Sequence, residues 1–329
     1  MKKVITFLLQ LAVVVLVGAL AIGMIRERVV RIPVGDALET SVTVADQLKS
    51  NLRVKKFNTI LVARDDSFPD ALSGSCLASA YSAPILLVGE ETVWEIRAYI
   101  EENIAEGGTV YLLGDEEVVP DLVTGGLFGI TVKRLGGTTR LDTNLQILQE
   151  MGVTGGEIMV CSGWSYADAL SAAVLNRPLL LVGESLTEAQ REFLSGCSDS
   201  MKFYIIGGTA AVGKEVADEL AQFGTIMRIS GETRCDTSVN VARKFFSVPE
   251  SVVLLYSHDF VQGLCAIPLA VEMNAPLILT NENDAGYCIE YMKDLGIRSG
   301  TVLADEDTLS DDLIVRIFRL NDPSAIKTD

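Results

Sequence analysis

Short apolar runs alternate with longer amphipathic segments along most of the chain. In the first third, four apolar runs predict buried parallel strands at Thr59–Ala63, Ile85–Val88, Val110–Leu113 and Ile130–Leu135. Amphipathic segments predict helices at Ala71–Tyr81, Val93–Glu106, Pro120–Leu127 and Thr139–Met151. Because strand and helix patterns alternate, the expected fold class is α/β, with doubly wound parallel sheets.

The N-terminal segment has the pattern of an export signal. After Lys2 and Lys3, the run Val4–Ile25 contains 22 residues without a charge. Ala19-Leu20-Ala21 matches an A-x-A cleavage site, which favours a cleaved signal peptide within residues 1–28. The same run is long enough for a retained transmembrane anchor, since about 20 apolar residues span a bilayer. Both alternatives export the rest of the chain, and they remain open.

Four short motifs recur in the same order. The first is R-L-G-G-T-T-R-L-D-T-N at 134–144, R-I-S-G-E-T-R-C-D-T-S at 228–238 and the degenerate R-I-P-V-G-D-A-L-E-T-S at 31–41. The second is S-F-P-D-A-L at 67–72, S-Y-A-D-A-L at 165–170 and the degenerate F-V-Q-G-L at 260–264. The third is P-I-L-L-V at 84–88, P-L-L-L-V at 178–182 and P-L-I-L-T at 276–280, and the fourth is Y-L-L-G at 111–114, Y-I-I-G-G at 204–208 and V-L-A-D at 302–305. This order predicts three tandem Rossmann-like units, at 29–133, 134–227 and 228–329, after the N-terminal segment 1–28.

One strand is predicted to leave its own unit. The third unit ends in a predicted helix at Ser310–Arg319, with no fourth strand after it. The strand pattern at Val29–Ile32 precedes the first unit and resembles the fourth strands of the other two, which also end in arginine and an aliphatic residue. We therefore expect Val29–Ile32 to complete the third sheet and close the three units into a ring.

Composition and charge exclude some classes of function. The chain of 329 residues is 49% hydrophobic, and 44 acidic against 27 basic residues give a net charge of −17. This balance argues against nucleic-acid binding, which requires clustered Lys and Arg. A single histidine, His258, excludes histidine-rich metal sites, and its position favours a surface or capping role. The six cysteines form no C-x-x-C pair and are expected to be buried free thiols.

The first motif carries helix caps and two unusual arginines. Asp36 with Glu39, Thr139 with Asp142, and Thr233 with Asp236 have the spacing of an N-cap and its N3 residue, which predicts capping boxes. Arg140 and Arg234 follow two of these caps, where a cation opposes the helix dipole. We therefore expect each arginine to be held by an anion or by a carboxylate of the neighbouring unit.

The second motif places acidic and aromatic residues at the start of a helix. Asp70 and Asp168 follow a strand and open a helix, which is the carboxyl edge of a parallel sheet, where such folds bind ligands. Aromatic residues that could stack on a sugar ring stand in the same loops at Phe68, Trp164, Tyr166 and Phe260. The alternative is a helix-dipole acid with packing between units.

Catalytic motifs are incomplete. Gly208–Lys214 fits G-x-x-x-x-G-K, but Glu215 follows where a phosphate loop needs Ser or Thr. Gly213 aligns with Pro120 and Ser310, which are also helix-start residues, so this segment is a predicted cap. The segment Gly163–Ala167 lacks the last glycine of G-x-S-x-G. Triplication favours a multivalent binding surface over a single active site.

Taken together, the ordered motifs resemble the cell wall-binding repeat 2 family of Gram-positive bacteria, in its usual three tandem copies, over about residues 31–320. The resemblance implies Rossmann-like lobes in a pseudo-threefold triangle and non-covalent binding to an anionic cell-wall polymer or glycan. It also implicates the I-L-L segments, which by position are Ile85, Leu86 and Leu87, then Leu179, Leu180 and Leu181, then Leu277, Ile278 and Leu279. From the residues alone these segments are core strands.

The expected function is therefore that of an exported, non-catalytic wall-binding protein without a cofactor, at the cell wall or the extracellular face. Arg140, Arg234, Asp70, Asp168 and the aromatic residues are the candidate contacts. The alternative is a membrane-anchored envelope scaffold or receptor that binds protein or small-molecule ligands between units; an enzyme acting on a nucleotide or sugar is the least favoured class. If uncleaved, the N-terminal segment adds the membrane as a partner.

Charge and departures from the motifs qualify this expectation. The motifs are interrupted at Ala37, Asp115, Gln262–Gly263 and Ala304–Asp305. A net charge of −17 repels an anionic polymer, although salt screens this beyond about 8–10 Å. Binding then needs local basic residues or bridging divalent cations.

Overall fold

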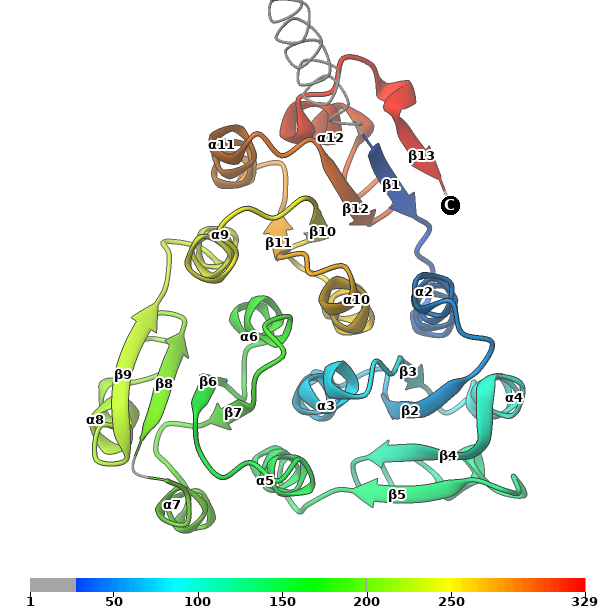
Figure 1. Cartoon of the computed structure of the whole chain (residues 1–329), viewed down its shortest axis with the longest axis vertical. Coiled ribbons are helices and arrows are strands. Elements are labelled where there is room, and N and C mark those ends of the chain that lie inside the picture. The colour runs from blue at the N-terminus through cyan, green and yellow to red at the C-terminus, as the bar shows by residue number, and fades with distance from the viewer. Residues whose placement is uncertain (1–27, 199, 329) are drawn as a thin grey trace, which may run out of the picture.

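The computed structural model describes residues 28–198 and 200–328, which form three α/β lobes at the corners of a triangle (Figure 1). Apart from Arg28, the predicted export segment lies outside the described residues. Each lobe is one sheet with its flanking helices, and every strand pair is parallel, as the alternating pattern predicted.

The three sheets share one spatial order of strands, in which the second strand of each lobe lies at an edge beside the first. In that order the first sheet has β3 (Ile85–Val88), β2 (Phe57–Arg64), β4 (Ile104–Leu113) and β5 (Thr131–Leu135). The second has β7 (Leu179–Val182), β6 (Glu157–Ser162), β8 (Met201–Ile206) and β9 (Gly224–Ile229). The third has β11 (Leu277–Thr280), β10 (Val252–Tyr256), β12 (Ser299–Leu303), β1 (Arg28–Ile32) and β13 (Ile326–Thr328).

Helices connect these strands. In the first third they are α2 (Ala37–Leu52), α3 (Phe68–Ala80) and α4 (Val93–Asn103). The middle third has α5 (Arg140–Glu150), α6 (Ala167–Ala173), α7 (Glu188–Ser195) and α8 (Lys214–Leu220). The last third has α9 (Arg234–Phe245), α10 (Phe260–Glu272), α11 (Ala285–Leu295) and α12 (Asp311–Phe318).

The helix predicted at Pro120–Leu127 is wrong. Only a 3-10 turn, η1 (Asp121–Val123), forms there. Gly125 and Gly126 follow after Thr124, and Gly126 has φ of +75°, which a right-handed helix cannot accommodate. The second lobe has α8 at the corresponding place, so the two lobes differ in this connection.

The N-terminal strand completes the third sheet, as predicted. β1 pairs in parallel with β12, with Val30 beside Thr301 and Ile32 beside Leu303. The prediction that no strand follows the last helix is wrong, because β13 pairs with the other side of β1. This strand is only three residues long, too short to show an alternating pattern.

Strand-end arginines join the fourth strand of each sheet to the loop that follows the third. Arg134 donates to the carbonyls of Gly114, Asp115 and Val119, and Arg228 donates in the same way to Gly207, Gly208 and Val212. In the third lobe Arg31 donates to the carbonyls of Ala304 and Leu309 and pairs with Asp311. The first arginine of the first motif is therefore structural in all three copies.

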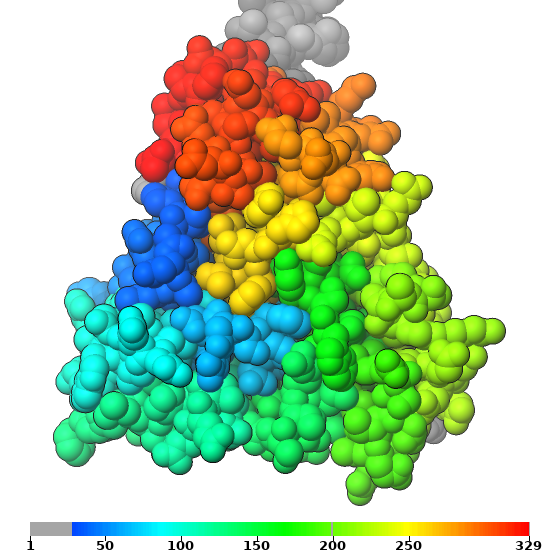
Figure 2. Space-filling view, turned by 180° about the vertical axis from the view of Figure 1, so that it is seen from behind, coloured from blue at the N-terminus to red at the C-terminus, as the bar shows by residue number. Residues whose placement is uncertain are grey.

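The centre of the triangle is filled by the helices that open with the second motif, α3, α6 and α10 (Figure 1). Phe68, Tyr166 and Phe260 meet there, with ring centroids 5.7, 5.8 and 6.1 Å apart. Seen from behind, α2 in blue lies against α10 in yellow, so the first and last thirds of the chain are in contact (Figure 2). The three equivalent rings mark the pseudo-threefold axis.

The inward edges of the sheets are covered by the helices of the first motif. Asn144 of α5 donates to the carbonyl of Leu179 at 2.8 Å and accepts from the amide of Leu181 at 2.9 Å. At the corresponding position of α9, Ser238 accepts from the amide of Leu279 at 3.0 Å. These side chains occupy the exposed backbone groups of β7 and β11 and prevent further strand pairing there.

The cysteines are free, as predicted. Five are buried, and Cys197 is half-buried. Burial raises the pKa of the Cys76 and Cys235 thiols to about 11, so these thiols stay protonated and unreactive at neutral pH. Within the described part of the chain, none of the helices combines the length and apolar character needed to cross a bilayer.

Candidate functional site at the lobe junctions

Asp36, Thr139 and Thr233 are helix N-caps, as predicted, but only one of the three predicted capping boxes is complete. Asp36 and Thr233 each accept from the backbone amide of the residue at N3. Thr139 and Asp142 form a complete capping box at the start of α5. Asp236 accepts from the amide of Glu232, one residue before the N-cap. Asp36 and Asp142 thus accept from amides at the starts of their helices, whereas Asp236 accepts from a loop amide just before its helix.

Arg140 lies between the first and second lobes. One of its amino groups, Nη1, donates to the carbonyl of Gly163 at 2.8 Å, and its guanidinium lies 5.2 Å from the ring centre of Trp164. These contacts place it at the carboxyl end of β6. The cation at the helix start is thus compensated by a strand-end carbonyl and an aromatic face.

Arg234 occupies the same place between the second and third lobes. It donates to the carbonyl of Ser257 at 3.0 Å and to the hydroxyl of Tyr166 at 3.3 Å, with its guanidinium 5.7 Å from the ring centre of Tyr166. Tyr166 belongs to the second lobe and Ser257 to the third. Arg234 therefore bridges the lobes directly.

Asp70 and Asp168 of the preceding lobe lie close enough to Arg140 and Arg234 to interact with their charges. The groups that hold each arginine are the carbonyl and aromatic contacts described above, and not a carboxylate. Burial raises the pKa of both carboxyl groups. A hydrogen bond from Thr143 and the charge of Arg140 partly offset this for Asp70, and Thr237 and Arg234 do the same for Asp168. Each junction thus combines one cation, one partly buried acid and one threonine.

The two threonines belong to these junctions and were not among the site residues predicted from the sequence. Thr143 and Thr237 also accept from the amides of Gly137 and Gly231, which fixes the loop before each helix. Their signal was present, because a threonine stands at this place in all three copies of the first motif. Thr40 makes the equivalent bond with Gly35 in the first copy.

At the third junction, between the third and first lobes, both the arginine and the aspartate are replaced by uncharged residues. Ala37 stands in the place of the arginine and Gln262 in the place of the aspartate, and α2 and α10 pack against each other there. At the other junctions a glycine with φ of +107°, Gly114 or Gly207, lies beside the aspartate oxygen Oδ2. The third lobe has Ala304 at this position. Three departures from the motifs that are far apart in the sequence, at Ala37, Gln262 and Ala304, therefore lie at one junction in the structure.

The aromatic residues separate into two groups. Phe68, Tyr166 and Phe260 pack on one another at the axis, which favours the packing role over sugar stacking for them. Trp164 is 59% exposed and lines a crevice of about 910 Å³ at the carboxyl edge of the second sheet. Glu184, Thr209 and Glu215 line the same crevice. Its size is within the usual range for ligand sites, about 300–1,000 Å³.

The I-L-L side chains are core residues. All nine are at most 1% exposed: Ile85, Leu86, Leu87, Leu179, Leu180, Leu181, Leu277, Ile278 and Leu279. Their strands are edge strands, but Asn144 and Ser238 cover two of those edges. These segments form the cores of the lobes around the junctions. Their side chains have no surface that a polymer could contact directly.

The remaining candidates are structural. His258 is exposed, with its Nδ1 3.0 Å from the Ser257 hydroxyl, as expected for a surface histidine. Gly213 is the N-cap of α8 and Ser310 that of α12, which agrees with the predicted helix starts. Across residues 28–198 and 200–328 no cluster of His, Cys, Asp and Glu has the arrangement of a metal site.

The repeated junctions, the closed ring and the triplicate motifs agree with a comparison against known families. The sequence model of Cell wall binding domain 2 (CWB2) matches residues 31–124, 134–217 and 228–314. The chain belongs to the CWB2 family. It carries three copies of this cell wall binding domain.

Relatives of known description share the CWB2 region. The chain is 31% identical over 186 residues to the N-acetylmuramoyl-L-alanine amidase LytC of Bacillus subtilis (strain 168), covering 55% of this chain and 37% of that protein. It is 25% identical over 244 residues to the Amidase enhancer of the same organism, covering 72% of this chain and 33% of that protein. The chain thus spans about a third of the length of these relatives.

Solved structures have the same fold. Cwp8 from Clostridium difficile superposes with a TM-score of 0.77 at 25% identity, over 89% of this chain and 52% of that one. Cwp6 from Clostridium difficile gives a TM-score of 0.76 at 22% identity, over 90% of this chain and 48% of that one. The three parallel sheets described above are therefore the CWB2 architecture.

Proposed function

We propose that this CWB2 chain is an exported, non-catalytic protein that attaches non-covalently to an anionic polymer or glycan of a Gram-positive cell wall. The observation that supports it most is the pairing of Arg140 with the exposed Trp164 beside the crevice of the second lobe. An aromatic face beside a fixed cation suits a sugar that carries a negative charge.

The second junction is a weaker contact point. Arg234 is held by Tyr166 and Ser257, and Tyr166 is itself packed at the axis. The third junction lacks both charged residues. We therefore place the main polymer contact at Arg140 and Trp164, with Arg234 contributing charge and with Asp70 and Asp168 as nearby acids at the same two junctions.

The acidic residues of the crevice set a condition on binding. Glu184 and Glu215 face the same space as Trp164, and the chain as a whole has a net charge of −17. An anionic polymer entering there would be repelled unless divalent cations bridge its anionic groups to these carboxylates. Calcium or magnesium should therefore strengthen attachment.

Co-sedimentation with purified Gram-positive cell walls tests the proposal. The full chain should sediment with the walls, and Arg140→Ala combined with Arg234→Ala should reduce the bound fraction several-fold, as should Trp164→Ala. Lys55→Ala combined with Lys56→Ala removes the same charge from an exposed loop before β2 and should leave sedimentation unchanged. The proposal fails if the wild-type chain stays in the supernatant at every salt and divalent-ion concentration.

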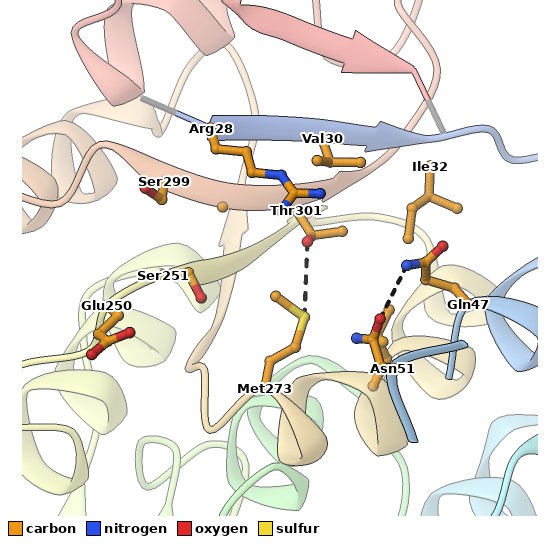
Figure 3. Close-up of a pocket in the computed structure, with 12 residues that line it drawn as sticks. Arg28, Val30, Ile32, Gln47, Asn51, Glu250, Ser251, Met273, Ser299 and Thr301 are labelled. Atoms are coloured by element: carbon orange, nitrogen blue, oxygen red, sulfur yellow. Dashed lines mark hydrogen bonds between the residues drawn. The ribbon is translucent and has the colours of Figure 1, made fainter. Parts of the chain in front are cut away.

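A second candidate function is that of an envelope receptor for small ligands. It is favoured by a separate pocket at the junction of the third and first lobes (Figure 3). This function is compatible with wall attachment, because the two sites are in different sheets. The pocket lies at the amino ends of strands of the third sheet, and the Trp164 crevice lies at the carboxyl edge of the second sheet.

A further inference from the structure

The pocket at the third junction has a volume of about 400 Å³ and lies towards the amino ends of β1, β10 and β12. Figure 3 shows Arg28 and Val30 on β1 above it, with Thr301 of β12, Met273 below and Gln47 of α2 at one side. At the two other junctions the corresponding space is filled by a tyrosine side chain.

Sheet register makes Thr301 equivalent to two tyrosines. Each of the three residues lies on the third strand of its lobe, between the first and fourth strands. The pairs are Thr301 with Val253 and Val30, Tyr111 with Leu61 and Lys133, and Tyr204 with Met159 and Met227. Where the third lobe has a pocket, the other two therefore carry a phenol ring.

Both tyrosines are enclosed by the same kinds of group, although these groups come from different elements in the two lobes. Tyr111 is 3% exposed and donates its hydroxyl to Glu150 at 2.8 Å, with the Lys133 amine 5.6 Å from the ring centre. Tyr204 is also 3% exposed and donates to Glu157 at 2.9 Å, with the Lys202 amine 4.6 Å from its ring centre. A phenol at this position thus meets an acceptor at its hydroxyl and a cation over its face.

A second aromatic residue packs on each ring. Tyr81 stacks on Tyr111 with 6.2 Å between centroids, and Phe245 lies edge-on to Tyr204 at 5.0 Å. Each of these junctions is therefore filled by a phenol with an aromatic neighbour.

The third junction lacks the ring, and other residues line the space around it, with Val30 at the strand position of Lys133. Gln47, at the helix position of Glu150, donates its amide to Asn51 at 3.2 Å, which leaves its carbonyl oxygen Oε1 to accept (Figure 3). Met273 replaces Tyr81, and its sulfur lies 3.9 Å from the Thr301 hydroxyl. Arg28 supplies a cation at the pocket.

We propose that this pocket binds a small ligand with a 4-substituted phenol ring, in the place that a tyrosine side chain occupies at the other two junctions. The ring lies between Val30 and Met273, whose thioether favours aromatic contacts. Its hydroxyl donates to Gln47 Oε1, and the Arg28 guanidinium lies over its face. This site is independent of wall attachment.

The probe for the test is 4-methylphenol, which is the side chain of tyrosine. With the full chain held in a mild detergent, saturation-transfer NMR and calorimetry should show saturable, weak binding. Thr301→Tyr fills the pocket with the residue of the other lobes, so it should weaken binding at least tenfold and leave the melting temperature equal or higher. Thr138→Tyr, the same substitution in an exposed loop, should bind like the wild type and controls for partition into the detergent.

Gln47→Leu provides an independent measurement. It should weaken 4-methylphenol several-fold and leave binding of toluene, which lacks the hydroxyl, within twofold of the wild type. The proposal is overturned if 4-methylphenol shows no saturable binding to the wild-type chain, or if Thr301→Tyr binds it equally well. An equal loss of both ligands in Gln47→Leu would overturn the assigned acceptor.

Discussion

The guanidinium of Arg31 donates to the carbonyl of Ala304 at 2.6 Å, although 273 positions separate the two residues in the chain. The same amino acid at the same strand position makes the local contact in the other lobes, through Arg134 and Arg228. The N-terminal strand is therefore held in the third lobe by the same device that holds the fourth strand elsewhere.

Replacing Arg31 should destabilise the fold. Arg31→Ala leaves the carbonyls of Ala304 and Leu309 without their donor, at a cost of about 2–4 kcal/mol in the free energy of unfolding. Urea denaturation measures this. Arg28→Ala, which removes an exposed arginine from the same strand, is the control and should change stability by less than about 0.5 kcal/mol. Equal effects of the two variants would contradict the assignment.

The three rings at the axis should be energetically coupled. In a double-mutant cycle, Phe68→Ala and Phe260→Ala should show a coupling energy of about 0.5–1.5 kcal/mol, because their rings are in contact. The comparison pair is Phe68→Ala with Phe128→Ala, since Phe128 is 93% exposed in a loop. That pair should be additive, and coupling of the same size there would argue against a local effect.

Removing an unpaired polar atom at the third junction should stabilise the chain. Gln262 Oε1 is buried without a hydrogen-bond partner. Gln262→Met keeps the volume and removes that atom, so the free energy of unfolding should rise by about 1 kcal/mol. Gln190 is the matched control, because its buried amide donates to Leu181 and accepts from Thr187. Gln190→Met should instead destabilise the chain, and a loss of stability in Gln262→Met would contradict the prediction.

The junction acids should make stability depend on pH in a defined direction. Burial raises the pKa of Asp70 and Asp168 in the folded chain, so the folded state holds their protons more tightly than the unfolded state does. Their contribution is favourable at low pH and is lost as the pH rises through the folded pKa. Relative to Asp70→Asn combined with Asp168→Asn, the wild type should therefore lose stability as the pH rises above about 4, the ordinary pKa of an aspartate.

The change of stability with pH should have the opposite sign for Glu150. Hydrogen bonds from Lys133 and Tyr111 lower the pKa of its carboxyl group. The wild type should therefore gain stability relative to Glu150→Gln over the same rise in pH. Thermal denaturation at several pH values measures both differences, and the same sign for the two would contradict the assigned shifts.

Local and repeated features, including the strand that completes the third sheet, were predictable from the sequence. Individual side-chain contacts between distant residues were not. The capping residues follow from spacing alone, and β1 was predictable because its Arg-aliphatic ending matches the strands of the other units. The short β13 and the glycines that prevent a helix after Asp121 gave signals too weak to outweigh the general pattern. The partners of Arg140 could not be predicted, because Gly163 and Trp164 are more than 20 positions away in the sequence and contact it only in the folded chain. The absence of a large side chain at Thr301 became informative only once register made it equivalent to Tyr111.

The strand exchange through β1 also limits how the protein can grow. In an open array of repeats, an additional copy can be appended to a free end, where it buries one more face. In this chain the place after the last lobe is already taken by the strand that precedes the first lobe. An extra copy would have to be inserted into a closed circuit, displacing the rings at the axis. The number of copies is therefore a geometric property of the circuit, and a fourth duplication would require a second, separate triangle.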